Sequence, residues 1–133
     1  MTMQKDKPGN VYVAVVDDDE SLCRSFARLL RAAGMQPITY LSAEAFLADK
    51  KHPQFDCLLL DIQLTGMSGL ELQKQLAATQ GAAPVIFITA HDDPRSRELA
   101  YTAGCAGYLR KTDSGDDVLA AIRSALAGPS IPQ

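Results

Sequence analysis

The chain has no run of apolar residues close to the roughly 18–20 that a membrane-spanning helix needs. Residues 1–10, MTMQKDKPGN, are polar and lack the apolar core of a secretion signal. Basic residues are in the minority, with 13 Lys and Arg against 16 Asp and Glu and a net charge of −3. Because sequence-independent nucleic-acid binding needs a basic surface, we expect neither nucleic acid nor membrane to be a direct partner of this domain.

Cysteine is scarce, and its pattern excludes two kinds of site. The three cysteines, Cys23, Cys57 and Cys105, are odd in number and have neither CxxC nor metal-ligand spacing. Each lies in or beside an apolar segment, which predicts buried, reduced thiols in a cytoplasmic protein. The sequence also lacks a glycine-rich loop with a Walker lysine, so a nucleotide site of the usual kind is excluded.

At 133 residues and 47% apolar content, the chain is long enough for one domain with its own core. We expect residues 1–10 to form a flexible leader, 11–127 the folded domain, and 128–133 a C-terminal tail or linker. No internal repeat or low-complexity segment divides it.

Apolar runs alternate with segments of helical period. Continuous apolar runs without polar alternation predict strands that are covered on both faces. Helix signals lie between them, including Gly34 as a stop, Ser42 as an N-cap, a capping box at Ser68 and Asp93-Pro94 as a helix start. The alternation predicts an α/β fold with a parallel sheet between helices. The expected strands are 11–16, 37–41, 55–60, 83–88 and 106–109, and the expected helices are 21–33, a short one after 42, 69–78, 94–103 and 114–127.

Polar residues follow four of these strands where each one ends. Asp17-Asp18-Asp19 follows VYVAVV, Asp61 follows FDCLLL, Thr89 follows PVIFI, and Lys111 comes shortly after Leu109. In a parallel sheet all these ends meet at the carboxyl edge, where ligands bind. We therefore expect carboxylates, a hydroxyl and an ammonium to converge there, with Asp19 serving as helix-start charge.

This set of groups suits phosphoryl chemistry. Carboxylates that lie close together raise one another's pKa or require a cation, and an all-oxygen site favours Mg²⁺. A carboxylate such as Asp61 can act as a nucleophile toward phosphorus, while Lys111 and Thr89 can neutralise charge and donate a hydrogen bond. Each residue alone is typical of an ordinary cap, strand or surface position, and only their joint occurrence at four strand ends favours a site.

Four segments carry a resemblance to a known family: VAVVDDDESLCRSF, DCLLLDIQLTGMSGLEL, PVIFITAHDD and AGCAGYLRK. They resemble the receiver domain of two-component response regulators, and DIQLTGMSG and ITAHDD are most similar to its FixJ-like transcriptional group. The resemblance implies a flavodoxin-like (βα)5 three-layer sandwich with strand order 2-1-3-4-5. It also implies a signalling switch and not an enzyme, apart from self-phosphorylation and slow autodephosphorylation.

The resemblance implies a role for each site residue. Asp61 is the expected phosphoacceptor, and Asp17, Asp18, Asp61 and the backbone carbonyl of Gln63 are the expected Mg²⁺ ligands. Thr89 and Lys111 are expected to contact the phosphoryl group, and Thr89 and Tyr108 to act as the switch pair.

The same resemblance implies partners. A sensor histidine kinase is the expected phosphoryl donor, and an output domain outside this chain is expected to control transcription. A homodimer through the face formed by the fourth helix, fifth strand and fifth helix is also expected.

Two positions depart from the family pattern. Proline usually follows the lysine, in a cis peptide, but Thr112 stands here. A cis bond without proline costs about 2.5–4 kcal/mol, which favours a trans bond with a rerouted loop but leaves the isomer open. Proline is also common four positions after the acceptor, where this chain has Thr65, which restores an N–H group.

Three alternatives remain open on the sequence. Residues 61–65, DIQLT, nearly match the DxDxT signature of haloacid-dehalogenase phosphatases, but Gln63 replaces the general acid and Asp61 follows the third strand instead of the first. A stand-alone receiver that acts through protein–protein contacts is a second alternative. A receiver-like scaffold that is never phosphorylated is the third.

Overall fold

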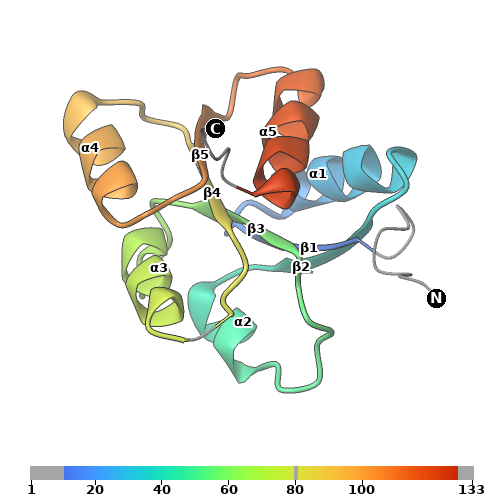
Figure 1. Ribbon diagram of the computed structural model, residues 1–133, viewed down its shortest axis with the longest axis horizontal. Helices are drawn as coiled ribbons and strands as arrows, with labels where there is room; N and C mark the ends of the chain where they lie inside the picture. Colours follow the sequence, from blue (N-terminus) through green and yellow to red (C-terminus); the bar gives the residue numbers. More distant parts are fainter. Residues whose placement is uncertain (1–10, 80, 129–133) are drawn as a thin grey trace, which may run out of the picture.

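The computed structural model describes residues 11–79 and 81–128, in which strands and helices alternate along the chain (Figure 1). The leader and residues 129–133, predicted as part of a tail, lie outside the described residues. The elements are β1 (Tyr12–Val16), α1 (Glu20–Ala32), β2 (Gln36–Tyr40), α2 (Ala43–Ala48), β3 (Cys57–Asp61), α3 (Gly69–Ala77), β4 (Val85–Thr89), α4 (Pro94–Thr102), β5 (Gly107–Arg110) and α5 (Gly115–Ala127).

The strands form one parallel sheet in the order β2-β1-β3-β4-β5. This confirms the predicted fold class and strand order. The third and fourth strands begin two residues later than predicted, because Phe55 packs in the core ahead of β3 and Pro84, ahead of β4, has no N–H group for a ladder. The same two strands end one residue later than predicted, so Asp61 and Thr89 are their last residues, at the carboxyl edge.

The sheet separates two apolar layers. Helices α1 and α5 lie together on one face, and α2 and α3 lie on the other (Figure 1). Successive strand residues point alternately into the two layers. On one face, strand residues pack with side chains of α1 and α5; this layer contains Val13, Val15, Leu59, Ile86 and Ile88 from the strands and Phe26, Leu30, Val118 and Ile122 from the helices. Val16, Leu58, Leu60, Val85 and Phe87 pack with Phe46, Leu72 and Ala100, which places α4 on the α2–α3 side.

Every helix begins with a side-chain cap at the carboxyl edge of the sheet. The caps at Ser42, Ser68 and Asp93 and the stop after α1, where Gly34 has a φ of 84°, confirm the predicted helix signals. The predicted capping box is complete, since Ser68 and Glu71 bond each other's backbone N–H groups. The capping residues are Asp19, Ser42, Ser68, Asp93 and Ser114.

None of the helices in the described part of the chain has the length and apolar character needed to cross a bilayer.

Candidate functional site

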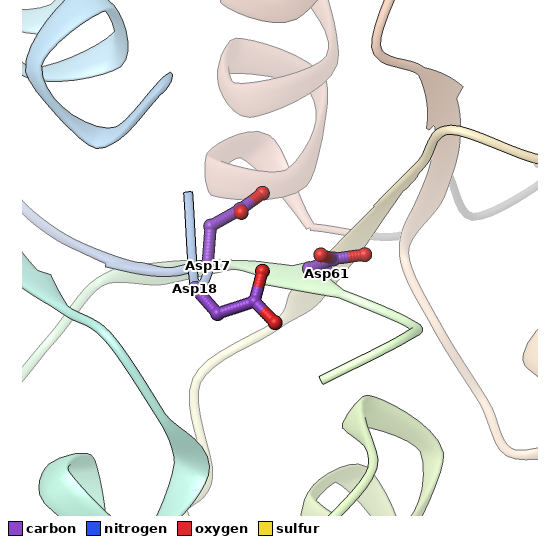
Figure 2. A group of neighbouring side chains, drawn as sticks. All are labelled: Asp17, Asp18 and Asp61. Atoms are coloured by element: carbon purple, nitrogen blue, oxygen red, sulfur yellow. The ribbon is translucent and has the colours of Figure 1, made fainter. Parts of the chain in front are cut away.

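Three carboxylates meet where β1 and β3 end (Figure 2). Asp17 and Asp18 follow β1 directly, and Asp61 closes β3. One ligand oxygen from each lies within 4.8 Å of the others, so the group could hold a metal ion. Asp17 and Asp61 are almost fully buried, at 2% and 4% exposure, whereas Asp18 is exposed. The cluster thus combines two desolvated charges with one that faces solvent.

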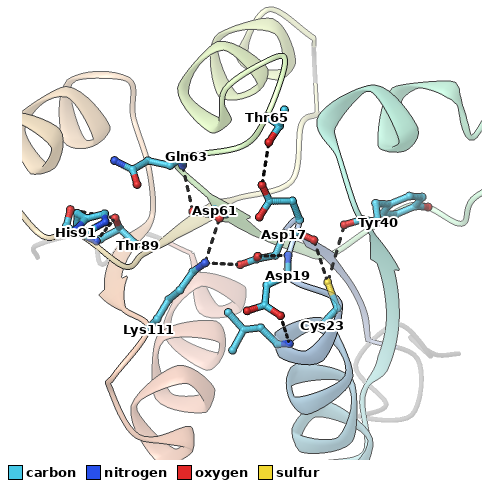
Figure 3. Close-up of polar contacts among 12 residues, drawn as sticks. Asp17, Asp19, Cys23, Tyr40, Asp61, Gln63, Thr65, Thr89, His91 and Lys111 are labelled. Carbon is cyan, nitrogen blue, oxygen red and sulfur yellow. Dashed lines mark hydrogen bonds and ion pairs between the residues drawn. The ribbon is translucent and has the colours of Figure 1, made fainter.

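Lys111 joins this cluster from the end of β5. Its Nζ lies 3.0 Å from Asp17 Oδ2 and 3.1 Å from Asp61 Oδ2 (Figure 3). The register explains the meeting, since Asp17, Asp61 and Lys111 continue the alternation of the strand residues that face α1 and α5. No cis peptide bond occurs among the described residues, so the Lys111–Thr112 bond, which the sequence left open, is trans. The ammonium reaches both carboxylates without the family's proline.

The pKa of Asp61 and the pKa of Lys111 are both raised, but for different reasons. Burial raises the pKa of Asp61, and the nearby Asp17 raises it further, against the lowering effect of the Gln63 N–H and Lys111. Burial acts to lower the pKa of Lys111, but its pairs with Asp17 and Asp61 outweigh burial and raise it. The charged form of Lys111 is therefore favoured, while ionisation of Asp61 is opposed.

Gln63 lies beside the acceptor candidate, and Thr89 is turned away from it. The backbone N–H of Gln63 donates to Asp61 Oδ1 at 3.1 Å. The buried Thr89 hydroxyl donates to the carbonyl of His91 and accepts from the N–H of His91, both at 3.0 Å (Figure 3). Thr89 therefore closes the turn that leads to α4, and among the described residues it makes no hydrogen bond to the carboxylate cluster.

Tyr108 lies on the α4 side of the sheet. It is half-buried, and its hydroxyl has no hydrogen-bond partner within the described residues. The guanidinium carbon of Arg97 lies 5.0 Å from the centre of its ring, and Arg97 is bonded to Asp92 at 2.8 Å. The ring of the exposed Tyr101 is 6.3 Å away. Tyr108 is thus covered by residues of α4 and of the turn before it.

Sequence reasoning missed one contact at the carboxylate cluster and one in the loop beside it. The Thr65 hydroxyl donates to Asp18 Oδ2 at 3.2 Å, and Glu44 Oε2 accepts from the N–H of Met67 at 2.8 Å. Thr65 drew notice only as a departure from proline, and no spacing in the sequence links it to Asp18.

The Cys23 thiol lies behind the cluster and donates to the carbonyl of Asp17. Burial raises the pKa of Cys23 to about 11, so the thiol stays protonated, as predicted for a buried cysteine.

Comparisons with known proteins agree with this site geometry. Residues 13–123 match the family described as "Response regulator receiver domain". The chain is 36% identical over 114 residues to the response regulator protein TmoT of Ectopseudomonas mendocina, and 34% identical over 119 residues to the transcriptional regulatory protein FixJ of Azorhizobium caulinodans. These alignments cover 86% and 90% of this chain but 52% and 56% of the relatives, so the chain spans about half their length.

Solved structures show the same architecture. A response regulator receiver protein from Burkholderia phymatum is 43% identical, with a TM-score of 0.77 over 88% of this chain and 95% of that one. The BeF₃-activated receiver domain of DrrB is 29% identical, with a TM-score of 0.79 over 88% of this chain and 97% of that one. The haloacid-dehalogenase alternative finds no support, because Asp61 ends the third strand and the family match covers most of the chain. This chain belongs to the response regulator receiver domain family.

Proposed function

We propose that this domain is a phosphorylation-dependent switch in which Asp61 accepts a phosphoryl group from a sensor histidine kinase. The main support is the arrangement of the cluster. The Asp61 carboxylate is buried at the end of β3, next to two further carboxylates, and lies 3.1 Å from the ammonium of Lys111. Membership of the receiver family implies two-component signalling. A kinase, and not a small substrate, is the proposed partner because the cluster has an acceptor and charge-neutralising groups but no general acid for turnover.

The proposed transfer uses groups of this chain at known positions. An Asp61 oxygen attacks the phosphorus of a phosphohistidine; the new O–P bond forms as the N–P bond breaks, and the electron pair stays on the imidazole nitrogen. Lys111 Nζ, already paired with Asp61, then lies within reach of the negative phosphoryl oxygens. The hydrogen bond from the Gln63 N–H keeps the carboxylate in its orientation during the attack.

The carboxylate cluster fits the divalent cation that this chemistry uses. Asp17, Asp18, Asp61 and the backbone carbonyl of Gln63 are the proposed ligands for Mg²⁺, because an all-oxygen set of this charge suits a small hard cation. When bound, Mg²⁺ supplies positive charge for the phosphoryl oxygens. Burial and the nearby Asp17 oppose ionisation of Asp61, so a bound cation would stabilise the charged carboxylate.

The proposed output begins at Thr89 and Tyr108. Phosphorylation adds about −1.5 to −2 charge units, and we propose that Thr89 then leaves His91 for the phosphoryl oxygens while Tyr108 moves inward. The altered surface would be the α4–β5–α5 face, through which a homodimer forms. FixJ and other relatives are named as transcriptional regulators, so we propose a cytoplasmic regulator whose output domain, outside this chain, controls transcription.

Intact mass after treatment with acetyl phosphate and Mg²⁺ tests the assignment. The wild-type chain is expected to gain one phosphoryl group, and Asp61→Asn is expected to gain none. Asp56→Asn is the matched control, because Asp56 bonds the N–H of Tyr12 at the opposite edge of the sheet. Phosphorylation that survives in Asp61→Asn would disprove the site. Absence of any gain in the wild type would favour the phosphorylation-silent scaffold.

A further inference from the structure

We propose that Thr65 is a positioning residue for Asp18, and that Glu44 holds the loop that presents it. Thr65 lies between β3 and α3, and Glu44 lies in the first turn of α2. The inference rests on the proposed function in one respect only, namely that the carboxylate cluster binds Mg²⁺. It adds a residue pair, outside the set taken from the family pattern, that tunes how strongly this chain binds the cation.

The three carboxylates are supported unequally. Asp17 accepts from the N–H of Asp19 at 2.9 Å and pairs with Lys111, and Asp61 accepts from the N–H of Gln63 and pairs with Lys111. Asp18 is the exposed member of the cluster, and within the described residues the Thr65 hydroxyl is its one hydrogen-bond partner. Without Thr65, only water would orient the Asp18 carboxylate.

The Thr65 bond leaves half of the carboxylate available. The hydroxyl donates to Oδ2 at 3.2 Å, and Oδ1 of Asp18 has no protein partner among the described residues. A carboxylate held by one oxygen loses less rotational freedom when the other binds a cation. Proline at this position would have no group to donate, so this support follows from the departure at Thr65.

An exposed hydroxyl keeps such a partner only if its loop is fixed, and Glu44 supplies the restraint. Glu44 Oε2 accepts from the N–H of Met67 at 2.8 Å, and this bond is the main cause that lowers the pKa of Glu44. The same oxygen lies so close to Gly66 that an added Cβ there would be 2.7 Å away. The carboxylate therefore packs directly against the backbone of the loop, one residue from Thr65.

The test measures Mg²⁺ affinity by titration calorimetry on the unphosphorylated chain, with no phosphoryl donor. Thr65→Val keeps the shape and removes the donor, and it is expected to weaken binding about 5-fold, as one hydrogen bond of about 1 kcal/mol would. Thr65→Ser restores the donor and is expected to stay within about 2-fold of the wild type. Thr39→Val, on the exposed surface of β2, is the matched control and should leave the affinity unchanged.

Glu44 is tested through its dependence on Thr65. Glu44→Ala is expected to weaken Mg²⁺ binding, whereas the double variant Glu44→Ala/Thr65→Val should bind no more weakly than Thr65→Val alone, because Glu44 acts through the hydroxyl. Circular dichroism melting confirms that each variant is folded. Unchanged or tighter binding by Thr65→Val, or additive losses in the double variant, would overturn the inference. If the wild-type chain binds no Mg²⁺, the proposed cation site itself is wrong. If the wild-type chain binds Mg²⁺ but Thr65→Val binds it equally well, only the role of Thr65 is wrong.

Discussion

The ammonium nitrogen of Lys111 lies 3.1 Å from Oδ2 of Asp61, although the two residues are separated by 50 positions and come from non-adjacent strands. Both side chains continue the alternation that faces α1 and α5, so the strand register brings them together. The pair is mostly buried, with Lys111 at 20% and Asp61 at 4% side-chain exposure. Charges in such a setting affect both the stability and the chemistry of the domain.

Removing the ammonium should destabilise the fold. In Lys111→Met, two buried carboxylates lose their cation, and we expect the free energy of unfolding at neutral pH to fall by about 1–3 kcal/mol. Because the pKa of Lys111 is raised in the folded state, its contribution is present at neutral pH and is lost as pH rises through that raised value. Urea unfolding in the presence of a chelator measures the change. Lys74→Met, on exposed α3 surface, is the control, and an equal loss in both variants would contradict the expectation.

Removing the Asp61 charge should have the opposite effect. Its pKa is raised in the folded state, first by burial, so the folded chain binds the proton more tightly than the unfolded chain does. Stability is therefore highest below the ordinary carboxyl value and falls as pH rises toward the raised value. Without divalent cations, Asp61→Asn should be more stable than the wild type at neutral pH, by on the order of 1 kcal/mol. Unfolding curves measured from acidic to neutral pH check this, and a gap that widens toward acidic pH would refute it.

Gly69 is required by the close approach of α3 to the end of β3. A Cβ at this position would overlap the backbone carbonyl oxygen of Asp61. Gly69→Ala should lower the free energy of unfolding by about 1–3 kcal/mol and slow phosphorylation by acetyl phosphate, because the backbone at Asp61 must shift. Gly107→Ala is a matched control, since its nearest neighbour, Ile86 Cγ1, would be 3.4 Å from the new methyl group. Equal effects of the two substitutions would argue against the clash.

Arg97 should stabilise the ring of Tyr108. Its guanidinium lies 5.0 Å from the ring centre, and a partly exposed cation–π contact contributes about 0.5–1 kcal/mol. A double-mutant cycle with Arg97→Ala and Tyr108→Leu, read by urea unfolding, should give a coupling energy of that size. Arg95→Ala, also in α4, serves in place of Arg97→Ala as the control. A coupling energy near zero for the Arg97 pair would show that the contact carries no energy.

The order of the elements could be predicted from sequence because β1, β3 and β4 come from long apolar runs and most helices have an explicit start or stop signal. The errors lie in strand bounds, since apolar character alone does not show that Phe55 belongs to the core but not to the ladder. The convergence of Asp17, Asp61 and Lys111 also followed from the sequence, because parallel strands place all their carboxyl ends at one edge.

The remaining contacts of the site depend on side-chain geometry that sequence spacing does not encode. Thr89 ends β4 as expected, yet its hydroxyl is held by the backbone of His91. Thr65 lies between β3 and α3 and bonds Asp18, while Glu44 lies in α2 and bonds the N–H of Met67, each through a single hydrogen bond. Such contacts produce no periodic pattern in the sequence, so only the three-dimensional structure reveals them.

The sheet also separates the two residues that are proposed to move, Thr89 and Tyr108, from the charged residues of the cluster. Thr89 and Tyr108 share the register of Phe87, which faces the α2–α4 layer, whereas Asp17, Asp61 and Lys111 share the register of the α1–α5 layer. The proposed movement of Thr89 and Tyr108 would therefore begin on the α2–α4 side, while the charged residues lie on the α1–α5 side. Substitutions around Thr89 and Tyr108 are accordingly separated by the sheet from the layer in which Asp17, Asp61 and Lys111 are held.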